Sequence, residues 1–204
     1  MEDMFNEDYY ENGVVKKLSG YTNYRYMPTR SYEEAITIKE LWGDKYNVIL
    51  DWGCAKGYLV NALNQLGYTA YGYDISEYAI ANCHPKVKDK VSTEVFIKEA
   101  ECVICKDVME HVPEDKVVDV LNLINLKTCN EALFVIPLGD DDKFRIREYE
   151  MDVTHVTKKD EDWWIDKFRE AGFKIKNFSY SLGNIKKKWK HYEYGNGFFL
   201  VVPR

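Results

Sequence analysis

The stretch "VILDWGCAKGYLV", Val48 to Val60, passes from an apolar strand through a tight turn into a helix. Asp51 stands at the end of the strand, and the small residues Gly53, Ala55 and Gly57 follow at every second position. Small residues let a backbone turn sharply and approach a ligand closely. The first amides of the following helix point into the same space. The stretch therefore predicts a ligand-binding turn beside a carboxylate.

The spacing of this turn indicates what kind of ligand it takes. A dinucleotide-binding turn has the pattern G-x-G-x-x-G, whereas this one reads G-x-A-x-G and begins two residues after an acidic residue. A carboxylate repels a pyrophosphate and attracts a positive charge. Asp74, at the end of the next predicted strand and 17 residues after Gly57, is placed to accept hydrogen bonds from a ribose diol. The two acidic residues predict a nucleoside with a compact cationic tail, the form of S-adenosylmethionine.

The remaining pattern alternates apolar strands with amphipathic helices, which predicts a parallel sheet covered on both faces. Ser31 is expected to cap the first helix in a capping box with Glu34. Strands are predicted over residues 47–53, 69–74, 90–97, 101–107, 131–137, 173–182 and 196–203. Helices are predicted over residues 31–43, 57–67, 76–83, 113–126 and 158–173. The fold class is a Rossmann-like, doubly wound, mostly parallel α/β sheet of seven strands, with an antiparallel last pair because no helix separates those two strands.

Length and charge limit the function. A chain of 204 residues fits one domain, expected over residues 31–204, preceded by a tyrosine-rich strap or lid over residues 1–30. The net charge of −6 argues against general nucleic-acid binding. No apolar run approaches the roughly 18 residues of a membrane span, and the acidic start does not resemble a signal peptide. A cytoplasmic monomer or homodimer is expected.

Cysteine usage predicts neither disulfides nor a metal site. The five cysteines show no framework spacing, as expected for free thiols. Cys102 and Cys105 form a CxxC pair, but they lie in an apolar run that reads as a buried strand. Positions i and i+3 of a strand point to opposite faces. No histidine lies at zinc-binding spacing from them.

Four segments together resemble the successive motifs of class I S-adenosylmethionine-dependent methyltransferases. They are "VILDWGCAKGYLV", "AYGYDIS", "VICKDVMEHVPED" and "WWIDKFREAGFKI", in the order of that family and covering roughly residues 45 to 202. The likeness is greatest to small single-domain enzymes that methylate metabolites, sugars and quinones. The resemblance implies S-adenosylmethionine as cofactor and S-adenosylhomocysteine as product.

The resemblance also implies roles for individual residues. Asp51 organises the turn and reaches the methionine tail, and Asp74 takes the ribose hydroxyls. Ile75 packs on adenine, and the backbone of Asp107 and Val108 meets the amino group of the tail. The implied cofactor-binding residues are Asp51, Gly53, Cys54, Ala55, Gly57, Asp74, Ile75, Asp107 and Val108.

Ala55 departs from the family pattern, because most members have glycine there. Alanine is the smallest substitute, and we expect it to fit with a negative φ. In the N-terminal segment, Arg25 is expected either to pair with the cofactor's carboxylate from a lid or to lie on a solvated strap.

Candidate catalytic residues follow the fifth main strand. Asp152 and His155 are three residues apart in a predicted loop, so the carboxylate can orient and charge the imidazole of a general base. The alternative is that Asp152 forms a turn and His155 bonds to the backbone. Glu110 and His111 are expected to shape the cofactor loop rather than to act on substrate.

The methyl acceptor is the part of the function about which the sequence says least. The Asp/Asn-Pro-Pro-aromatic and Pro-Cys motifs of nucleobase methyltransferases are absent. With acidic charge and 16 tyrosines, the sequence favours a small hydroxylated acceptor such as a sugar or nucleotide-sugar, with O-methylation ahead of N-methylation. One alternative is an RNA methyltransferase that uses the loop Lys186 to Lys190, which otherwise is a solvated loop. Another is a non-catalytic partner protein that binds the cofactor.

Overall fold

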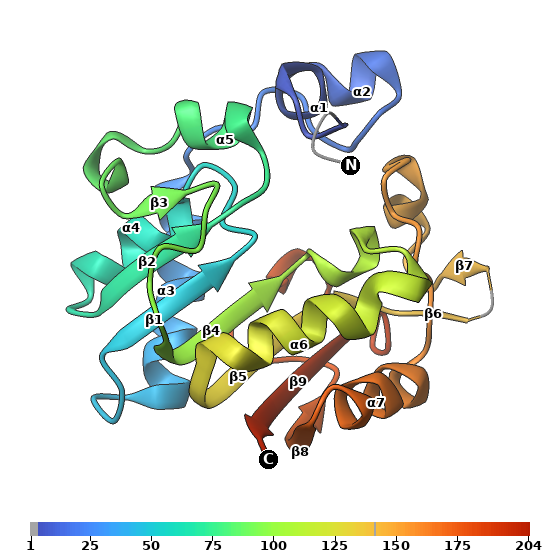
Figure 1. The fold of residues 1–204 in the computed structure, drawn as a ribbon. Helices are drawn as coiled ribbons and strands as arrows, with labels where there is room; N and C mark the ends of the chain where they lie inside the picture. The colour runs from blue at the N-terminus through green and yellow to red at the C-terminus, as the bar shows by residue number, and fades with distance from the viewer. Residues whose placement is uncertain (1–3, 141) are drawn as a thin grey trace.

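A seven-stranded sheet forms the centre of the protein (Figure 1). The computed structural model describes residues 4–140 and 142–204. The strand order is β3-β2-β1-β4-β5-β9-β8, and the ladders are parallel except where β9 pairs with β5 and β8. The predicted doubly wound α/β class with an antiparallel last pair is confirmed. The strands are β1 (Val48–Trp52), β2 (Thr69–Tyr73), β3 (Val91–Ser92), β4 (Ala100–Lys106), β5 (Thr128–Pro137), β8 (Phe173–Ser179) and β9 (Asn196–Pro203).

Helices cover both faces of this sheet, because its central strands are apolar on both sides. Helices α3 (Pro28–Trp42) and α4 (Tyr58–Gln65) pack on one face. Helices α6 (Val117–Lys127) and α7 (Glu161–Glu170) pack on the other, in front of the sheet in Figure 1. Cys102 faces the first layer and Cys105 the second, both buried and free, as the strand pattern predicts.

Short elements connect these layers. Ser76 is the N-cap of helix α5 (Glu77–Ala81), and its hydroxyl accepts a hydrogen bond from the Ala79 amide. The hairpin β6 (Gly139–Asp140) and β7 (Lys143–Phe144) follows β5. The single-turn 3-10 helices are η2 (Pro85–Val87), η3 (Met109–His111), η4 (Glu114–Lys116), η5 (Arg147–Met151) and η6 (Lys187–Trp189). None of the helices in the described part of the chain has the length and apolar character needed to cross a bilayer.

The first long helix begins earlier than predicted. Pro28 occupies its first turn and Met27 its N-cap, so Ser31 lies inside α3 rather than capping it. Proline is favoured at this position because its φ is already helical and its missing N–H costs nothing there. The predicted capping box of Ser31 and Glu34 is therefore wrong. Glu34 is instead buried, with its carboxylate 3.3 Å from Nε of Arg30 and 3.9 Å from Nζ of Lys106.

The N-terminal segment folds onto the body of the protein. It contains α1 (Glu7–Glu11) and α2 (Gly13–Lys16), which the sequence did not predict and which lie above the sheet in Figure 1. The hydroxyl of Tyr9 donates a buried hydrogen bond of 2.8 Å to Asp152, and the Val153 amide donates to the Leu18 carbonyl. The boundary expected between residues 30 and 31 falls inside α3.

Candidate active site

A cavity of about 630 Å³ opens at the carboxyl ends of β1, β2 and β4. This volume lies within the roughly 300–1,000 Å³ typical of small-molecule sites. In an open α/β sheet this edge is where ligands bind, at the point where the strand order reverses. The segment before α3 forms part of its wall through Phe5, Tyr9, Tyr10, Tyr21, Tyr24 and Arg25.

The predicted turn after β1 forms one side of the cavity. The amides of Gly53 and Cys54 donate to the Tyr73 carbonyl at 2.7 and 3.0 Å, which fixes the turn against β2. Gly53 has a φ of +83°, and a Cβ there would lie 2.2 Å from Cγ2 of Val108. Only glycine therefore allows the turn and the loop after β4 to pack this closely.

Gly57 ends the turn and begins the helix that follows it. It is the N-cap of α4 with a φ of +70°, and a Cβ there would lie 2.9 Å from Val87 and 3.1 Å from Val91. Gly57 is not among the described residues that line the cavity. Its missing Cβ allows α4 to pack against η2 and β3.

Ala55 adopts a positive φ of +48°, so the expected negative φ is wrong. Its amide donates a 2.7 Å hydrogen bond to Asp74, and this bond holds the residue in place. A left-handed backbone costs an L-residue about 1–2 kcal/mol, because Cβ approaches the following carbonyl oxygen.

Ala55→Gly is therefore expected to raise the free energy of unfolding by about 0.5–1 kcal/mol, after allowance for the more flexible unfolded chain. Urea unfolding of the metal-free, cofactor-free protein measures this. Ala81→Gly, at an exposed position in α5, is the control and should lower stability instead. A loss of stability in Ala55→Gly would show that the turn is not strained.

Asp51 lines the cavity from the penultimate position of β1, which ends one residue later at Trp52. Burial raises the pKa of its carboxyl to about 7, with Glu34 and Asp74 acting in the same direction and Lys106 opposing them. A carboxylate that is costly to ionise in the free protein gains from a cationic ligand. This is the electrostatic environment expected for the binding of a positive charge.

Asp74 and Ile75 line the cavity at the end of β2. The Asp74 carboxylate accepts hydrogen bonds from the amides of Ala55 (2.7 Å) and Ser76 (2.8 Å). Burial raises the pKa of this carboxyl, and the two amide donors partly offset the effect. Each carboxylate oxygen has a second lone pair, so the group still has capacity to accept hydrogen bonds from a diol.

Asp107 is the third acidic residue at the cavity and follows β4 with a φ of +58°. Its carboxylate lies 3.0 Å from Nζ of Lys106 and forms an ion pair with Lys186. Burial alone would raise the pKa of Asp107, but these two ammonium groups hold it well below its usual range.

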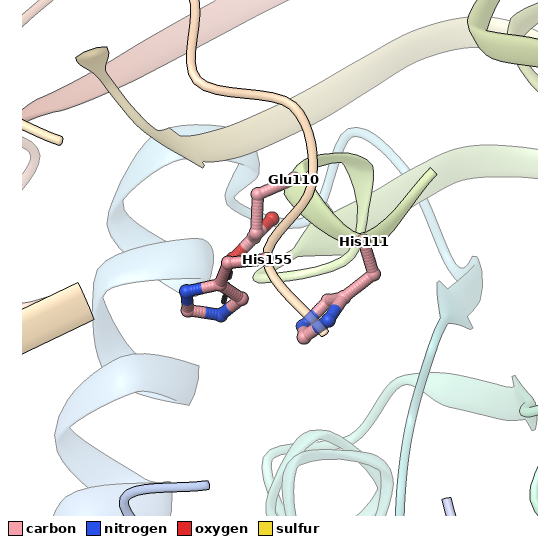
Figure 2. Close-up of side chains that lie close together, drawn as sticks. All are labelled: Glu110, His111 and His155. Carbon is pink, nitrogen blue, oxygen red and sulfur yellow. Dashed lines mark ion pairs between the residues drawn. The ribbon is translucent and has the colours of Figure 1, made fainter. Parts of the chain in front are cut away.

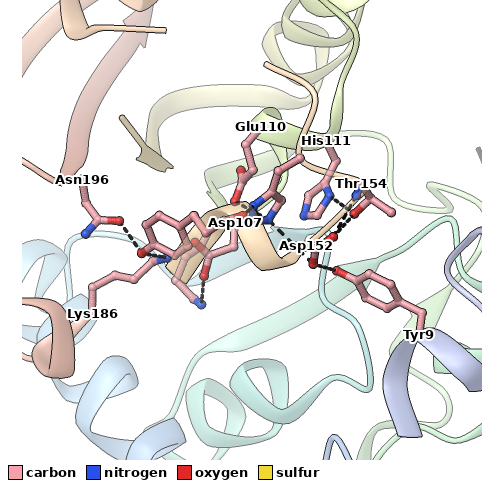
Figure 3. Close-up of polar contacts among 11 residues, drawn as sticks. Tyr9, Asp107, Glu110, His111, Asp152, Thr154, Lys186 and Asn196 are labelled. Carbon is pink, nitrogen blue, oxygen red and sulfur yellow. Dashed lines mark hydrogen bonds and ion pairs between the residues drawn. The ribbon is translucent and has the colours of Figure 1, made fainter. Parts of the chain in front are cut away.

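The lysine-rich loop is thus only partly solvated. Lys186 is buried and also donates a 2.8 Å hydrogen bond to the Tyr149 hydroxyl. Lys187 pairs with Glu33 at the surface, and Lys188 reaches the cavity wall. The expectation of a solvated loop is wrong for Lys186, whose charge is used inside the protein (Figure 3).

The predicted catalytic pair lies behind the cavity wall rather than in it. Neither Asp152 nor His155 is among the described residues that line the cavity. The Asp152 carboxylate accepts hydrogen bonds from Tyr9 and Thr154, and its nearest oxygen is 3.8 Å from His155 Nε2 (Figure 3). His155 bonds through Nδ1 to the Tyr149 carbonyl. Burial lowers the pKa of this imidazole, contrary to the charged state expected from an Asp–His pair.

His111 is the histidine that lines the cavity. Its Nδ1 lies 2.7 Å from the Thr154 hydroxyl, and its ring packs against His155 with centroids 4.6 Å apart (Figure 2). Burial, reinforced by His155, lowers the pKa of His111 to about 4. The motif "MEHV" placed this residue near the cofactor loop, but the sequence did not show that it faces the cavity and contacts residue 154.

Other cavity residues carried no sequence signal of their own. Buried Glu34, half-buried Lys106 and exposed Arg30 form a charge group beside Asp51, brought together from β4 and α3. Burial acts to lower the pKa of Lys106, but Asp107 and Glu34 outweigh it, so the pKa is raised. Arg25 lies exposed at the cavity rim.

Comparison with known proteins agrees with this geometry. Residues 25–176 match the family described as "Methyltransferase domain". The chain therefore belongs to the methyltransferase domain family, and its fold is that of the class I S-adenosylmethionine-dependent methyltransferases. The resemblance seen in the sequence motifs is confirmed. No curated protein matches the sequence.

Several solved structures share the fold at low sequence identity. Magnesium protoporphyrin IX methyltransferase (ChlM) from Synechocystis PCC 6803 with bound SAH matches with a TM-score of 0.67 and 14% identity, over 100% of this chain and 98% of that one. Mitomycin 7-O-methyltransferase MmcR matches at 0.65 and 12%, over 87% and 54%. An S-adenosylmethionine-dependent methyltransferase from Clostridium acetobutylicum ATCC 824 matches at 0.59 and 12%, over 85% and 91%.

Proposed function

We propose that this protein is a methyltransferase that uses S-adenosylmethionine to methylate a small hydroxylated acceptor, with a sugar or glycan precursor as the favoured class. The observation that carries the cofactor is the pair Asp51 and Asp74, which flank a glycine-dependent turn at the wall of a cavity of about 630 Å³. The structures with bound SAM or SAH among similar folds support the same cofactor.

The lining residues fit the parts of this cofactor. Asp74 and Ile75 would hold the adenosine, and Asp51 with the backbone of Gly53 would hold the cationic tail. Arg25, at the rim, would pair with the tail's carboxylate. The bound cofactor would supply an electrophilic methyl group. The acceptor oxygen would bond to that carbon as the carbon–sulfur bond breaks, S-adenosylhomocysteine would be the product, and the hydroxyl proton would pass to water.

The cavity wall that the N-terminal segment contributes is rich in tyrosine. Tyr10, Tyr21 and Tyr24 form a ring-contact cluster on the N-terminal segment, with centroid separations of 4.9–6.3 Å. Such rings offer flat apolar surfaces with polar tips, which suits sugars and other hydroxylated molecules. The segment that carries them would act as a lid. Two enzymes of similar fold are named for small-molecule acceptors, mitomycin and magnesium protoporphyrin IX.

A labelled-methyl transfer assay over sugars, nucleotide-sugars, phenols and RNA tests the proposal, preceded by calorimetric binding of S-adenosylmethionine. Transfer to a sugar or nucleotide-sugar is the expected result. Transfer to RNA alone would overturn the acceptor class. Cofactor binding with no transfer to any member would support the non-catalytic alternative, and absence of binding would reject the cofactor.

Asp74→Asn is expected to weaken S-adenosylmethionine binding about tenfold, because one charge-assisted hydrogen bond is worth roughly 1.5–3 kcal/mol. Calorimetry measures the affinity. The Ala55 and Ser76 amides donate to different oxygens of Asp74, and Asn keeps an acceptor for one of them, so circular dichroism is used to check that the variant is folded. Unchanged affinity in a folded variant would contradict the assignment of Asp74 to the ribose.

A further inference from the structure

Glu110 has a buried carboxylate with no hydrogen-bond donor among the described residues. The residue is 1% exposed, and neither carboxylate oxygen is hydrogen-bonded. The nearest cation-forming group is His155, whose Nε2 lies 4.0 Å away. A buried carboxylate without a partner is costly, and protonating it would still leave an O–H without an acceptor. This group therefore needs a ligand that the protein itself does not supply.

Two imidazoles stand beside this carboxylate with matching orientations. In His155, Nδ1 faces the Tyr149 carbonyl at 2.8 Å, so it carries the proton and leaves Nε2 as a free electron-pair donor. In His111, Nδ1 faces the Thr154 hydroxyl, which itself donates to Asp152. The Thr154 oxygen must then accept a hydrogen bond from Nδ1–H of His111, which leaves Nε2 of His111 as a free electron-pair donor.

Metal-binding histidines show this arrangement, with one ring nitrogen on the metal and the other N–H held by a carbonyl or a carboxylate-linked group. One ligand atom from each of Glu110, His111 and His155 lies within 4.8 Å of the others (Figure 2). Bonds of about 2.0–2.2 Å to a shared ion would require side-chain shifts of only about an ångström.

The charge around this cluster also favours a cation. The Asp152 carboxylate, which holds His111 in place through Thr154, lies 3.8 Å from Nε2 of His155. The third nearby acid, Asp107, is already compensated by Lys106 and Lys186. The lysines in this region therefore pair with Asp107 and leave Glu110 without an ammonium partner among the described residues.

We propose that Glu110, His111 and His155 bind a divalent first-row transition metal ion such as Mn²⁺. Two imidazoles and one carboxylate leave coordination positions open, and imidazole favours these ions over Mg²⁺. Because His111 lines the cavity, an ion bound by this residue would lie at the cavity wall. If the proposed function holds, the ion would bind the acceptor hydroxyl and make its proton easier to lose. This replaces the absence of a metal expected from the sequence.

Titration with Mn²⁺, followed by the loss of the free-ion signal in electron paramagnetic resonance, tests the site without any activity assay. The wild-type protein is expected to bind one Mn²⁺. Glu110→Gln and His155→Asn are each expected to weaken binding at least tenfold. Thr154→Val removes the hydroxyl that accepts the hydrogen bond of His111 Nδ1–H, and it is expected to weaken Mn²⁺ binding about tenfold. His191→Asn, an exposed histidine outside the cluster, is the control and should bind like the wild type.

The same variants are titrated with S-adenosylmethionine, which separates this proposal from the proposed function. Retained cofactor binding with lost Mn²⁺ binding supports the metal site. Absence of Mn²⁺ binding by wild-type protein that binds the cofactor overturns the site alone, as does equal Mn²⁺ binding by all variants. Glu110→Met is a second test if Glu110→Gln misfolds, because methionine has no oxygen that needs a hydrogen-bond partner. The metal-free variant should be at least as stable as the metal-free wild type. Mn²⁺ should no longer raise the melting temperature of this variant.

Discussion

Replacement of Lys186 with methionine is expected to lower the free energy of unfolding by about 3 kcal/mol. Lys186 is buried and forms an ion pair with Asp107, and it donates a hydrogen bond to Tyr149. Removing one partner of a buried pair typically costs about 3–5 kcal/mol, because the remaining charge is left in a poorly solvated place. The lower value applies here, since Asp107 keeps Lys106 at 3.0 Å. Methionine preserves most of the packing of the side-chain stem.

Urea unfolding monitored by tryptophan fluorescence measures this loss, and Lys187→Met is the matched control. Lys187 is the next residue in the same loop and pairs with Glu33 at the surface, with 58% of its side chain exposed. A surface pair is worth about 0–1 kcal/mol, so the control should change little. Equal effects of the two substitutions would contradict a buried role for Lys186 and would restore the interpretation of the loop as a solvated lysine cluster.

The central fold was predictable because its signals are local. Alternating apolar strands and helices of the α/β type determine a parallel sheet, and glycines mark the turns. The burial of Cys102 and Cys105 on opposite faces followed from the strand period alone. The turn after β1 was likewise visible as closely spaced small residues after a carboxylate.

Features that depend on contacts between distant segments were not predictable. Lys186 reads as one of four lysines in a polar loop, and only the return of that loop to the end of β4 gives it Asp107 as a partner. The folding of α1 and α2 depends on Tyr9 reaching Asp152, 143 residues away. The positive φ of Ala55 reflects its bond to Asp74, which no residue preference reveals.

In the candidate site, too, the features that depend on local sequence were predictable and those that depend on packing were not. The sequence located the turn and both acidic strand ends, since these follow from strand order. It could not show which histidine faces the cavity, because the side-chain directions of His111 and His155 depend on how two loops pack together. The unbonded carboxylate of Glu110 is also a property of packing and leaves no trace in composition.

Affinity for S-adenosylmethionine is expected to rise roughly tenfold between pH 6 and pH 7.5, and Asp51→Asn is expected to abolish this rise. The Asp51 carboxyl has its pKa raised to about 7 by burial, so at pH 6 it is mostly protonated and offers no charge to the sulfonium tail. A bound cation favours the ionised form, so binding costs a proton release below pH 7. That release is no longer needed once the pH exceeds the pKa of Asp51 in the cofactor-free protein. At pH 7.5 the variant should bind about 100-fold more weakly, since it lacks the charge altogether.

The stability of the cofactor-free protein should change with pH in the opposite direction. In the unfolded chain Asp51 ionises near pH 4, whereas in the folded protein it stays protonated until about pH 7. The contribution of Asp51 to the free energy of unfolding is therefore fully present below about pH 4 and is lost as the pH rises through 7. The groups that face Asp51, namely Lys106, Glu34 and Asp74, modify the pKa but do not reverse this sign.

Calorimetric titrations at several pH values, together with urea unfolding over the same range, separate Asp51 from its neighbours. Asp74→Asn should keep the pH dependence of binding, and Asp115→Asn, an exposed acid on η4, should behave like the wild type in both assays. A flat binding profile in the wild-type protein would mean that Asp51 is ionised before the cofactor arrives. A rise that persists in Asp51→Asn would assign the titration to another group and remove Asp51 from the cationic site.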